Sequence, residues 1–203
     1  MKFSVICGSH RAGSESGKVG RFIERTLLEQ GLCEEVYFFN LADFPLPLWD
    51  EGIWDGNPEW KERLAPISAE LAASDAFVVI SPEWHGMAPS GLKNFFLMWS
   101  KGELAHKPAL LCAVSSGDGG AYPIAELRMS SYKNNRLCYI PEQVIVRNVE
   151  KVLNEEGENL ASADEYFRER IPFALGILKE YALALRAVRA SGKTFDPKFK
   201  NGM

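Results

Sequence analysis

Residues 2–17 read KFSVICGSHRAGSESG, a mostly apolar run of six residues followed by a run of ten that is rich in glycine and serine. A short apolar run that ends at a glycine is typical of a buried strand. Beyond this loop, which holds more polar groups than a simple turn needs, a helix is expected from near Gly17 to Gly31. Its apolar positions recur at helical spacing: Val19, Phe22, Ile23 and Leu27.

The same alternation continues along the chain. We expect strands at 2–7, 35–39, 76–80, 109–114 and within 136–146, and further helices over 57–74, 90–100, 119–135 and from near Pro172 onward. Three of the strand runs are apolar nearly throughout, as parallel strands covered on both faces require. Strands that alternate with helices predict an α/β fold with a doubly wound parallel sheet. The polar, acidic segment 148–163 is expected to be a surface excursion.

Length and composition narrow the class of protein. A chain of 203 residues with 46% hydrophobic residues suits one domain, expected at 1–190 and followed by a frayed tail at 191–203. A net charge of −4 without a basic run argues against a nucleic-acid partner. Four scattered cysteines without a CxxC suggest neither a metal site nor disulfides, and Cys7 and Cys112 are expected to be small buried hydrophobes. The absence of a long apolar stretch and of a signal-like start favours a cytoplasmic protein with no membrane span.

Ligands of doubly wound sheets bind at the carboxyl ends of the strands, so the loops after strands 1, 3 and 4 are the candidates. In the first loop, glycines allow the backbone N–H groups to turn inward, and the following helix points its positive end at the same place. The hydroxyls and guanidinium there belong to Ser9, Arg11, Ser14 and Ser16. This predicts binding of a phosphate monoester, because the GxxxxGK[ST] and GxGxxG patterns are absent. The alternative is a polar turn with a capping serine, which is the preferred interpretation for Ser14 or Ser16 alone.

The other two loops favour a flat ligand next to that phosphate. Residues 81–94 read SPEWHGMAPSGLKN, in which prolines stiffen the chain and Trp84 offers a ring face. Residues 115–120 read SSGDGG and offer small donors, with Asp118 expected to point outward. Alternatives remain open: Trp84 as a core or interface aromatic, and Glu83 as a general base or as a residue that pins its own loop.

With these motifs the chain resembles the NAD(P)H-dependent FMN reductase family, the flavodoxin-like quinone, azo-dye and chromate reductases. The family pattern G-S-x-R-x-x-S-x-[NS] is met by residues 8–16. The pattern S/T-P-E-Y-N-x-S-x-P-G-x-L-K-N is met within residues 81–94 by Ser81, Pro82, Glu83, Pro89, Leu92, Lys93 and Asn94, and Gly91 lies one position after the glycine of the pattern. Trp84-His85 and Met87 stand in place of the usual Tyr-Asn and Ser. LADFPLPLWDEG (41–52), SSGDGG and LNEEGENL (153–160) are similar to further family segments. The resemblance covers most of the chain in order.

The resemblance implies a flavodoxin-like five-stranded parallel sheet in the order 2-1-3-4-5, bound FMN, and NAD(P)H as hydride donor to a quinone, flavin, azo or nitro compound, or metal oxyanion. It implies that the FMN phosphate is held by Ser9, Arg11, Ser14 and Ser16. The ring system would contact Pro82, Glu83, Trp84, His85, Gly86, Ser115, Gly117 and Gly119. It further implies a homodimer or homotetramer, to which the tryptophans of the 41–54 loop would contribute an interface. No side chain needs to act as an acid or base. His85 is the nearest candidate for a proton donor, and the alternative, which is preferred, is that it only hydrogen-bonds within its loop.

Two other classes of function remain to be compared. One is a flavin-binding electron carrier or redox-responsive interaction protein without NAD(P)H turnover, against which the mild net charge argues. The other is a serine hydrolase, which is disfavoured because the chain has no G-x-S-x-G nucleophile elbow.

Overall fold

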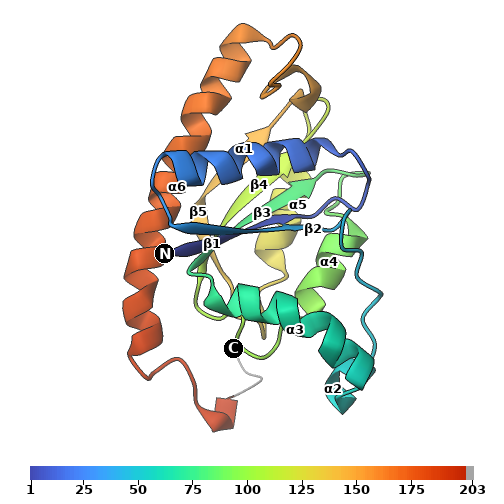
Figure 1. Cartoon of the computed structure of the whole chain (residues 1–203), viewed down its shortest axis with the longest axis vertical. Coiled ribbons are helices and arrows are strands. Elements are labelled where there is room, and N and C mark those ends of the chain that lie inside the picture. The colour runs from blue at the N-terminus through green and yellow to red at the C-terminus, as the bar shows by residue number, and fades with distance from the viewer. Residues whose placement is uncertain (200–203) are drawn as a thin grey trace.

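The fold is a five-stranded parallel sheet in the order β2-β1-β3-β4-β5, seen in a computed structural model that describes residues 1–199 (Figure 1). The strands are β1 (Lys2–Cys7), β2 (Glu35–Asn40), β3 (Ala76–Pro82), β4 (Pro108–Val114) and β5 (Cys138–Val146). Cys7 of β1 pairs with Ile80 of β3, which pairs with Cys112 of β4, so the carboxyl ends of the central strands lie level. The predicted strand order is confirmed.

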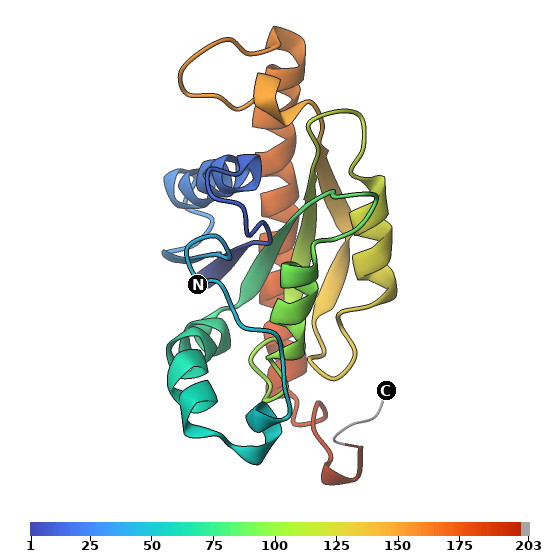
Figure 2. The ribbon, with the colours of Figure 1, turned by 90° about the vertical axis from the view of Figure 1, so that its right-hand side faces the viewer.

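Helices cover both faces of the sheet, as Figures 1 and 2 show. One face packs against α1 (Glu15–Glu29) and α6 (Ala161–Ala190), and the other against α3 (Pro58–Ala73), α4 (Ser90–Leu97) and α5 (Ala121–Met129). The short α2 (Gly52–Asp55) precedes α3, and two single turns of 3₁₀ helix are η1 (Val149–Lys151) and η2 (Pro197–Phe199).

The central strands hold this arrangement together. All residues of β3 and β4 are buried, because both faces of each strand contact a helix layer. Cys7 and Cys112 are fully buried free thiols, as predicted, and burial raises the pKa of both, that of Cys112 to about 12. These thiols are therefore small core residues that stay protonated.

One charged group in this core, the ammonium group of Lys107, is fully paired. The ammonium group of Lys107 donates to the carbonyl oxygens of Leu71, Ala72 and Glu103 at 2.7–2.8 Å. Two of these carbonyls belong to the last turn of α3, whose C=O groups have no partner within the helix. Burial lowers the pKa of Lys107 to about 8, and the lysine anchors the end of α3 to the start of β4.

The structure corrects the predicted start of the last helix. It begins at Ala161, and Pro172 lies inside it. Proline removes one backbone hydrogen bond from a helix interior, but Phe167 and Ile171 before it continue the buried stripe of Leu175 and Leu178 after it, and this packing holds the helix continuous.

The segment 148–163 also differs from its prediction as a purely surface excursion. Val149, Val152 and Leu153 are buried in the core shared with α1 and α6. Lys18 of α1 fixes the segment by donating to the carbonyl oxygen of Val149 and to Asn154, both at 2.7 Å. The segment is therefore anchored beside the start of α1.

Element boundaries differ elsewhere by a few residues. The helix of 119–135 spans only α5, the helix of 90–100 ends at Leu97, and α1 starts at Glu15 instead of Gly17. Within residues 1–199, no helix is both long and apolar enough to cross a bilayer. Part of the predicted tail, residues 200–203, lies outside the described residues, and the domain boundary near 190 stays a prediction.

Candidate functional site

The loop after β1 leads directly into the start of α1 at the carboxyl edge of the sheet. The N–H of Gly8 donates to the carbonyl oxygen of Ile80 at 2.8 Å, and a Cβ at position 8 would lie 2.7 Å from that oxygen, so only glycine allows this approach. Ser14 is the N-cap of α1, its hydroxyl accepting from the N–H of Gly17 at 3.3 Å. The N–H groups of Glu15 and Ser16, the first two residues of α1, have no carbonyl acceptor within the helix.

A cavity of about 210 Å³ lies at this edge of the sheet. It is lined from the first loop and α1 by Ser9, Arg11, Gly13, Ser14, Glu15 and Ser16, and from the other loops by Pro82, Glu83, Trp84, Val114, Ser115, Ser116, Val149 and Glu150. Ser9 and Ser16 are almost fully buried, whereas Arg11 is exposed. Within residues 1–199 the Arg11 guanidinium has no hydrogen-bond or ion-pair partner, so its donors are available to an anion.

Two of the three carboxylates in the cavity wall are already paired. Glu15 forms an ion pair with Lys18 at 2.5 Å, and Glu83 accepts the backbone N–H of Gly120 at 2.6 Å. Glu150 is exposed at the rim. The donors of the first loop are therefore the polar groups free to meet an anion, as a phosphate at a helix N-terminus requires.

A tight turn shapes the loop after β3. Trp84 and Met87 exchange both backbone hydrogen bonds, at 3.1 and 2.9 Å, around His85 and Gly86. Both turn residues have positive φ, 50° for His85 and 71° for Gly86, the combination of a type I′ turn. The turn sets His85 on an exposed tip, where it lines an open hollow of about 510 Å³ that adjoins the cavity.

The Trp84 indole borders both the cavity and this adjoining hollow, which share Arg11 and Glu83 as well. Its ring meets the edge of the His10 ring at a centroid distance of 4.7 Å and an angle of 88°. The aromatic contact fixes the loop after β3 against the loop after β1. Trp84 is half-buried and lines the site, which distinguishes it from a core aromatic.

Glu83 joins the loop after β3 to the loop after β4. Its carboxylate accepts the N–H of Gly120, and a Cβ on Gly119 would lie 2.7 Å from Glu83 Oε1. Glu83 therefore pins the neighbouring loop, not its own, and it does so only because position 119 is glycine.

The loop after β4 is held by the chain that follows β5. The N–H of Asn148 donates to the carbonyl oxygen of Gly117 and that of Val149 to Ser115, both at 3.1 Å. Arg147 adds a bond from Nε to the carbonyl oxygen of Asp118 at 2.7 Å. Asp118 itself is exposed, and its carboxylate accepts from Asn148, in agreement with the prediction that it points outward.

Two residues of α4, Lys93 and Asn94, stabilise these loops. Lys93 forms an ion pair with Glu126 at 2.8 Å, and Glu126 also accepts the N–H of Ala88 at 2.7 Å. Asn94 accepts the N–H of Trp49 and donates to the carbonyl oxygen of Pro47, both at 2.8 Å. Lys93 thus holds the 81–94 loop, and Asn94 holds the loop after β2.

The structure brings most of the sequence-predicted site residues together. Those that line the cavity are Ser9, Arg11, Ser14, Ser16, Pro82, Glu83, Trp84 and Ser115, and His85 lines the adjoining hollow. Gly86, Gly117 and Gly119 line neither, and Gly86 and Gly119 act through the backbone. Val149 and Glu150 also line the cavity and were not predicted. The only sequence signal for them is that the fifth strand, if parallel to the others, ends at the same edge of the sheet.

The sequence pattern of the family described as NADPH-dependent FMN reductase matches residues 1–151. Among curated relatives, an FMN-dependent NADPH-azoreductase of Staphylococcus saprophyticus is 25% identical over 173 residues, covering 84% of this chain and 90% of that protein. An NADPH azoreductase of Bacillus sp. (strain OY1-2) is 27% identical over 159 residues, covering 78% of this chain and 84% of that protein.

Solved structures support the fold. The flavoenzyme NAD(P)H:(acceptor) oxidoreductase FerB of Paracoccus denitrificans superimposes with a TM-score of 0.67 at 21% identity, covering 91% of this chain and 97% of that one. An NADH:FMN oxidoreductase, EMOB, superimposes with a TM-score of 0.64 at 14% identity, covering 99% of this chain and 94% of that one. The match over residues 1–151 includes β1 to β5, the loops that line the cavity and the start of α1. On this evidence, the chain belongs to the NADPH-dependent FMN reductase family.

Proposed function

We propose that the cavity at the carboxyl edge of the sheet holds FMN, and that the protein uses it to pass electrons from NADPH to an azo compound, a quinone or a free flavin. The observation that carries this proposal is the gathering of eight predicted residues, from three separate loops, around one cavity at the N-terminus of α1. Family membership supports FMN and NAD(P)H, and the names of the azoreductase relatives support the acceptor class.

The phosphate of FMN fits the end of the cavity formed by the first loop. Ser9 and Ser16 are almost fully buried and line this end of the cavity. The exposed Arg11 guanidinium is free to donate two parallel bonds to a phosphate. Ser14 would contribute mainly by capping α1, which keeps the N–H groups of the first turn in place. Among residues 1–199, Arg11 is the one cation that lines this cavity. A single cation beside the N–H donors of a helix end, without a P-loop lysine, suits a phosphate monoester.

The flat ring system fits the wall formed by Pro82, Trp84 and Ser115. Pro82 closes β3 and Trp84 offers an aromatic surface fixed by His10, so that wall is rigid before a ligand arrives. Ser115 and the backbone of its loop supply polar groups for a heterocycle edge, and the Glu83 bond to Gly120 sets the spacing between the two loops.

Bound FMN supplies the redox chemistry, accepting hydride from the nicotinamide and passing electrons to the acceptor. The chain's own contribution is to hold and orient: Arg11 and the serines fix the phosphate end, and Trp84 limits which face of the ring is open. His85, on the exposed turn beside Trp84, stands where an acceptor would enter and is placed to donate a proton to it. The alternative role, a hydrogen bond inside its own loop, finds no support among the hydrogen bonds of the described residues.

We also propose a cytoplasmic homo-oligomer. The loop after β2 carries an aromatic pair, Trp49 and Trp54, with ring centroids 4.6 Å apart, and Trp54 is 72% exposed. Exposed aromatic groups of this size favour an interface. The four free cysteines fit a reducing compartment.

Steady-state kinetics test the function. FMN-saturated protein should oxidise NADPH in the absence of oxygen when methyl red or a benzoquinone is added, at a rate well above that of free FMN alone. A protein that binds FMN but shows only the background rate would be an electron carrier, and the proposed turnover would be wrong.

A further inference from the structure

The cavity at the carboxyl edge of the sheet carries more negative than positive charge. The carboxylates of Glu15, Glu83 and Glu150 line it, whereas Arg11 is the one lining cation among residues 1–199. A phosphate monoester carries about −1.5 to −2 charges near pH 7, so nearby carboxylates weaken its binding unless other groups offset them. Glu83 accepts the N–H of Gly120, and Glu150 is exposed at the rim. Glu15, the first residue of α1, remains at the helix end where the phosphate is proposed to bind.

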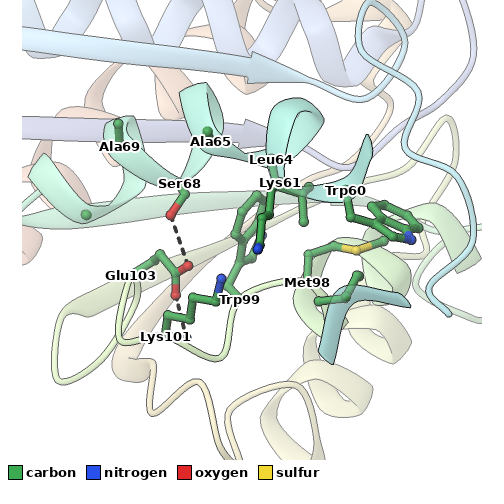
Figure 3. A pocket seen from close by; sticks show the side chains of 12 residues that line it. Trp60, Lys61, Leu64, Ala65, Ser68, Ala69, Met98, Trp99, Lys101 and Glu103 are labelled. Carbon is green, nitrogen blue, oxygen red and sulfur yellow. Dashed lines mark hydrogen bonds between the residues drawn. The ribbon is translucent and has the colours of Figure 1, made fainter. Parts of the chain in front are cut away.

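Glu15 depends on one cation for its pairing. Its Oε2 atom lies 2.5 Å from the ammonium nitrogen of Lys18, one turn further along α1. That oxygen is closed to solvent and has no other partner among residues 1–199. The carboxylate of Glu103, in the wall of a separate cavity beside α3, is satisfied differently (Figure 3). It accepts from two uncharged donors, the Ser68 hydroxyl at 3.0 Å and the backbone N–H of Lys101 at 2.8 Å. Loss of the Lys18 charge would therefore leave the charge of Glu15 unbalanced.

Lys18 is fixed in place by two further bonds. Its ammonium group donates to the carbonyl oxygen of Val149 and to Asn154 Oδ1, both at 2.7 Å. Together with Glu15, these acceptors use all three donors of the ammonium group. Lys18 does not line the cavity, whereas Val149 and Glu15 do. The charge of Lys18 therefore acts on a bound phosphate through Glu15 and not by contact.

We propose that Lys18 determines the preference of the site for a phosphorylated flavin by neutralising Glu15. The ion pair removes a repulsion that the phosphate would otherwise meet at the N-terminus of α1. The helix-end N–H groups and Arg11 are then left to bind the anion. The inference rests on the proposed function, because it takes FMN as the occupant of this cavity. It adds to the phosphate site a second cation, which sets specificity from outside the cavity wall.

A double-mutant cycle measured with two flavins tests this role. Lys18→Met should weaken FMN about tenfold more than riboflavin, the scale of one partly screened repulsion between like charges. Adding Glu15→Gln to that variant should return the ratio of FMN to riboflavin affinity to within about twofold of the wild-type ratio. Lys18→Arg keeps the positive charge and should preserve the ratio. Quenching of flavin fluorescence gives the dissociation constants.

Arg21→Met is the matched control. Arg21 lies on the same helix and forms an ion pair of the same spacing, with Glu24 at 2.7 Å, but neither residue lines the cavity. The substitution changes the net charge equally and should leave both affinities within about twofold of the wild type. Should Lys18→Met fail to fold, Glu15→Gln alone decides the matter, because it should strengthen FMN about threefold relative to riboflavin.

Three results would overturn the proposal. Equal losses of FMN and riboflavin in Lys18→Met, or no recovery on adding Glu15→Gln, would reduce Lys18 to an anchor of the 148–163 segment. A loss of the same size in Arg21→Met would reduce the effect to net charge. A wild-type protein that binds riboflavin as tightly as FMN would contradict the phosphate site itself and the inference with it, so failure of the proposed function is distinguishable from failure of this inference.

Discussion

Replacing Arg11 by alanine should weaken the binding of FMN while leaving the binding of riboflavin nearly unchanged. The guanidinium lines the cavity at the carboxyl edge, is exposed, and has no partner among residues 1–199, so the substitution removes donors without breaking an internal ion pair. Charge-assisted hydrogen bonds contribute about 1.5–3 kcal/mol, which corresponds to a loss of about 10- to 150-fold in affinity. Because Arg11 is exposed to solvent, the lower half of this range is expected.

Quenching of flavin fluorescence gives both dissociation constants. Riboflavin lacks the phosphate, so its affinity should fall by less than threefold in Arg11→Ala. Arg63→Ala is the matched control, since Arg63 is exposed on α3 and lines neither cavity, yet its loss changes the net charge equally. Equal losses for FMN and riboflavin would refute a phosphate-binding role for Arg11, and equal losses in both arginine variants would reduce the effect to net charge.

Two further predictions concern loop spacing and pH. Gly119→Ala places a Cβ 2.7 Å from Glu83 Oε1 and should break the bond from Gly120 to Glu83 that joins the two loops. FMN binding, measured by the same fluorescence titration, should weaken about tenfold. The control Gly117→Ala has open space at its Cβ position and should bind FMN normally. Asp75 receives hydrogen bonds from Arg186 at 2.6 and 2.9 Å, and although burial raises its pKa, these bonds hold the pKa below its ordinary value. Asp75→Asn should therefore lower the free energy of unfolding by about 1 kcal/mol at pH 7, a difference present in full above about pH 5 and lost as the pH falls through the lowered pKa. Urea denaturation at a series of pH values checks this, and a difference that grows toward low pH would contradict it.

The sheet could be predicted from sequence because its signals are local and strong. The runs at 2–7, 76–80 and 109–114 are apolar and bounded by turns, and the structure has them as β1, β3 and β4 within two residues. The start of α6 was missed for the opposite reason. Proline is usually a helix breaker, and only the tertiary packing of Phe167 and Ile171 shows that the helix continues through Pro172.

The candidate site was predictable as a set of loops but not as a set of contacts. Residues after strands 1, 3 and 4 were chosen because parallel strands end at one edge, and eight of them line one cavity. The wall formed by Val149 and Glu150 comes from a polar segment with no motif. The bond from Glu83 to the N–H of Gly120 joins two loops far apart in sequence, so only the fold reveals why position 119 is glycine.

The most direct test of the account is a crystal structure of the protein with FMN at saturating concentration. The account predicts the phosphate at the N-terminus of α1, within hydrogen-bonding distance of Ser9, Ser16 and Arg11, and the ring against Trp84. FMN bound elsewhere, or an empty cavity at the end of β1 despite saturating FMN, would contradict it.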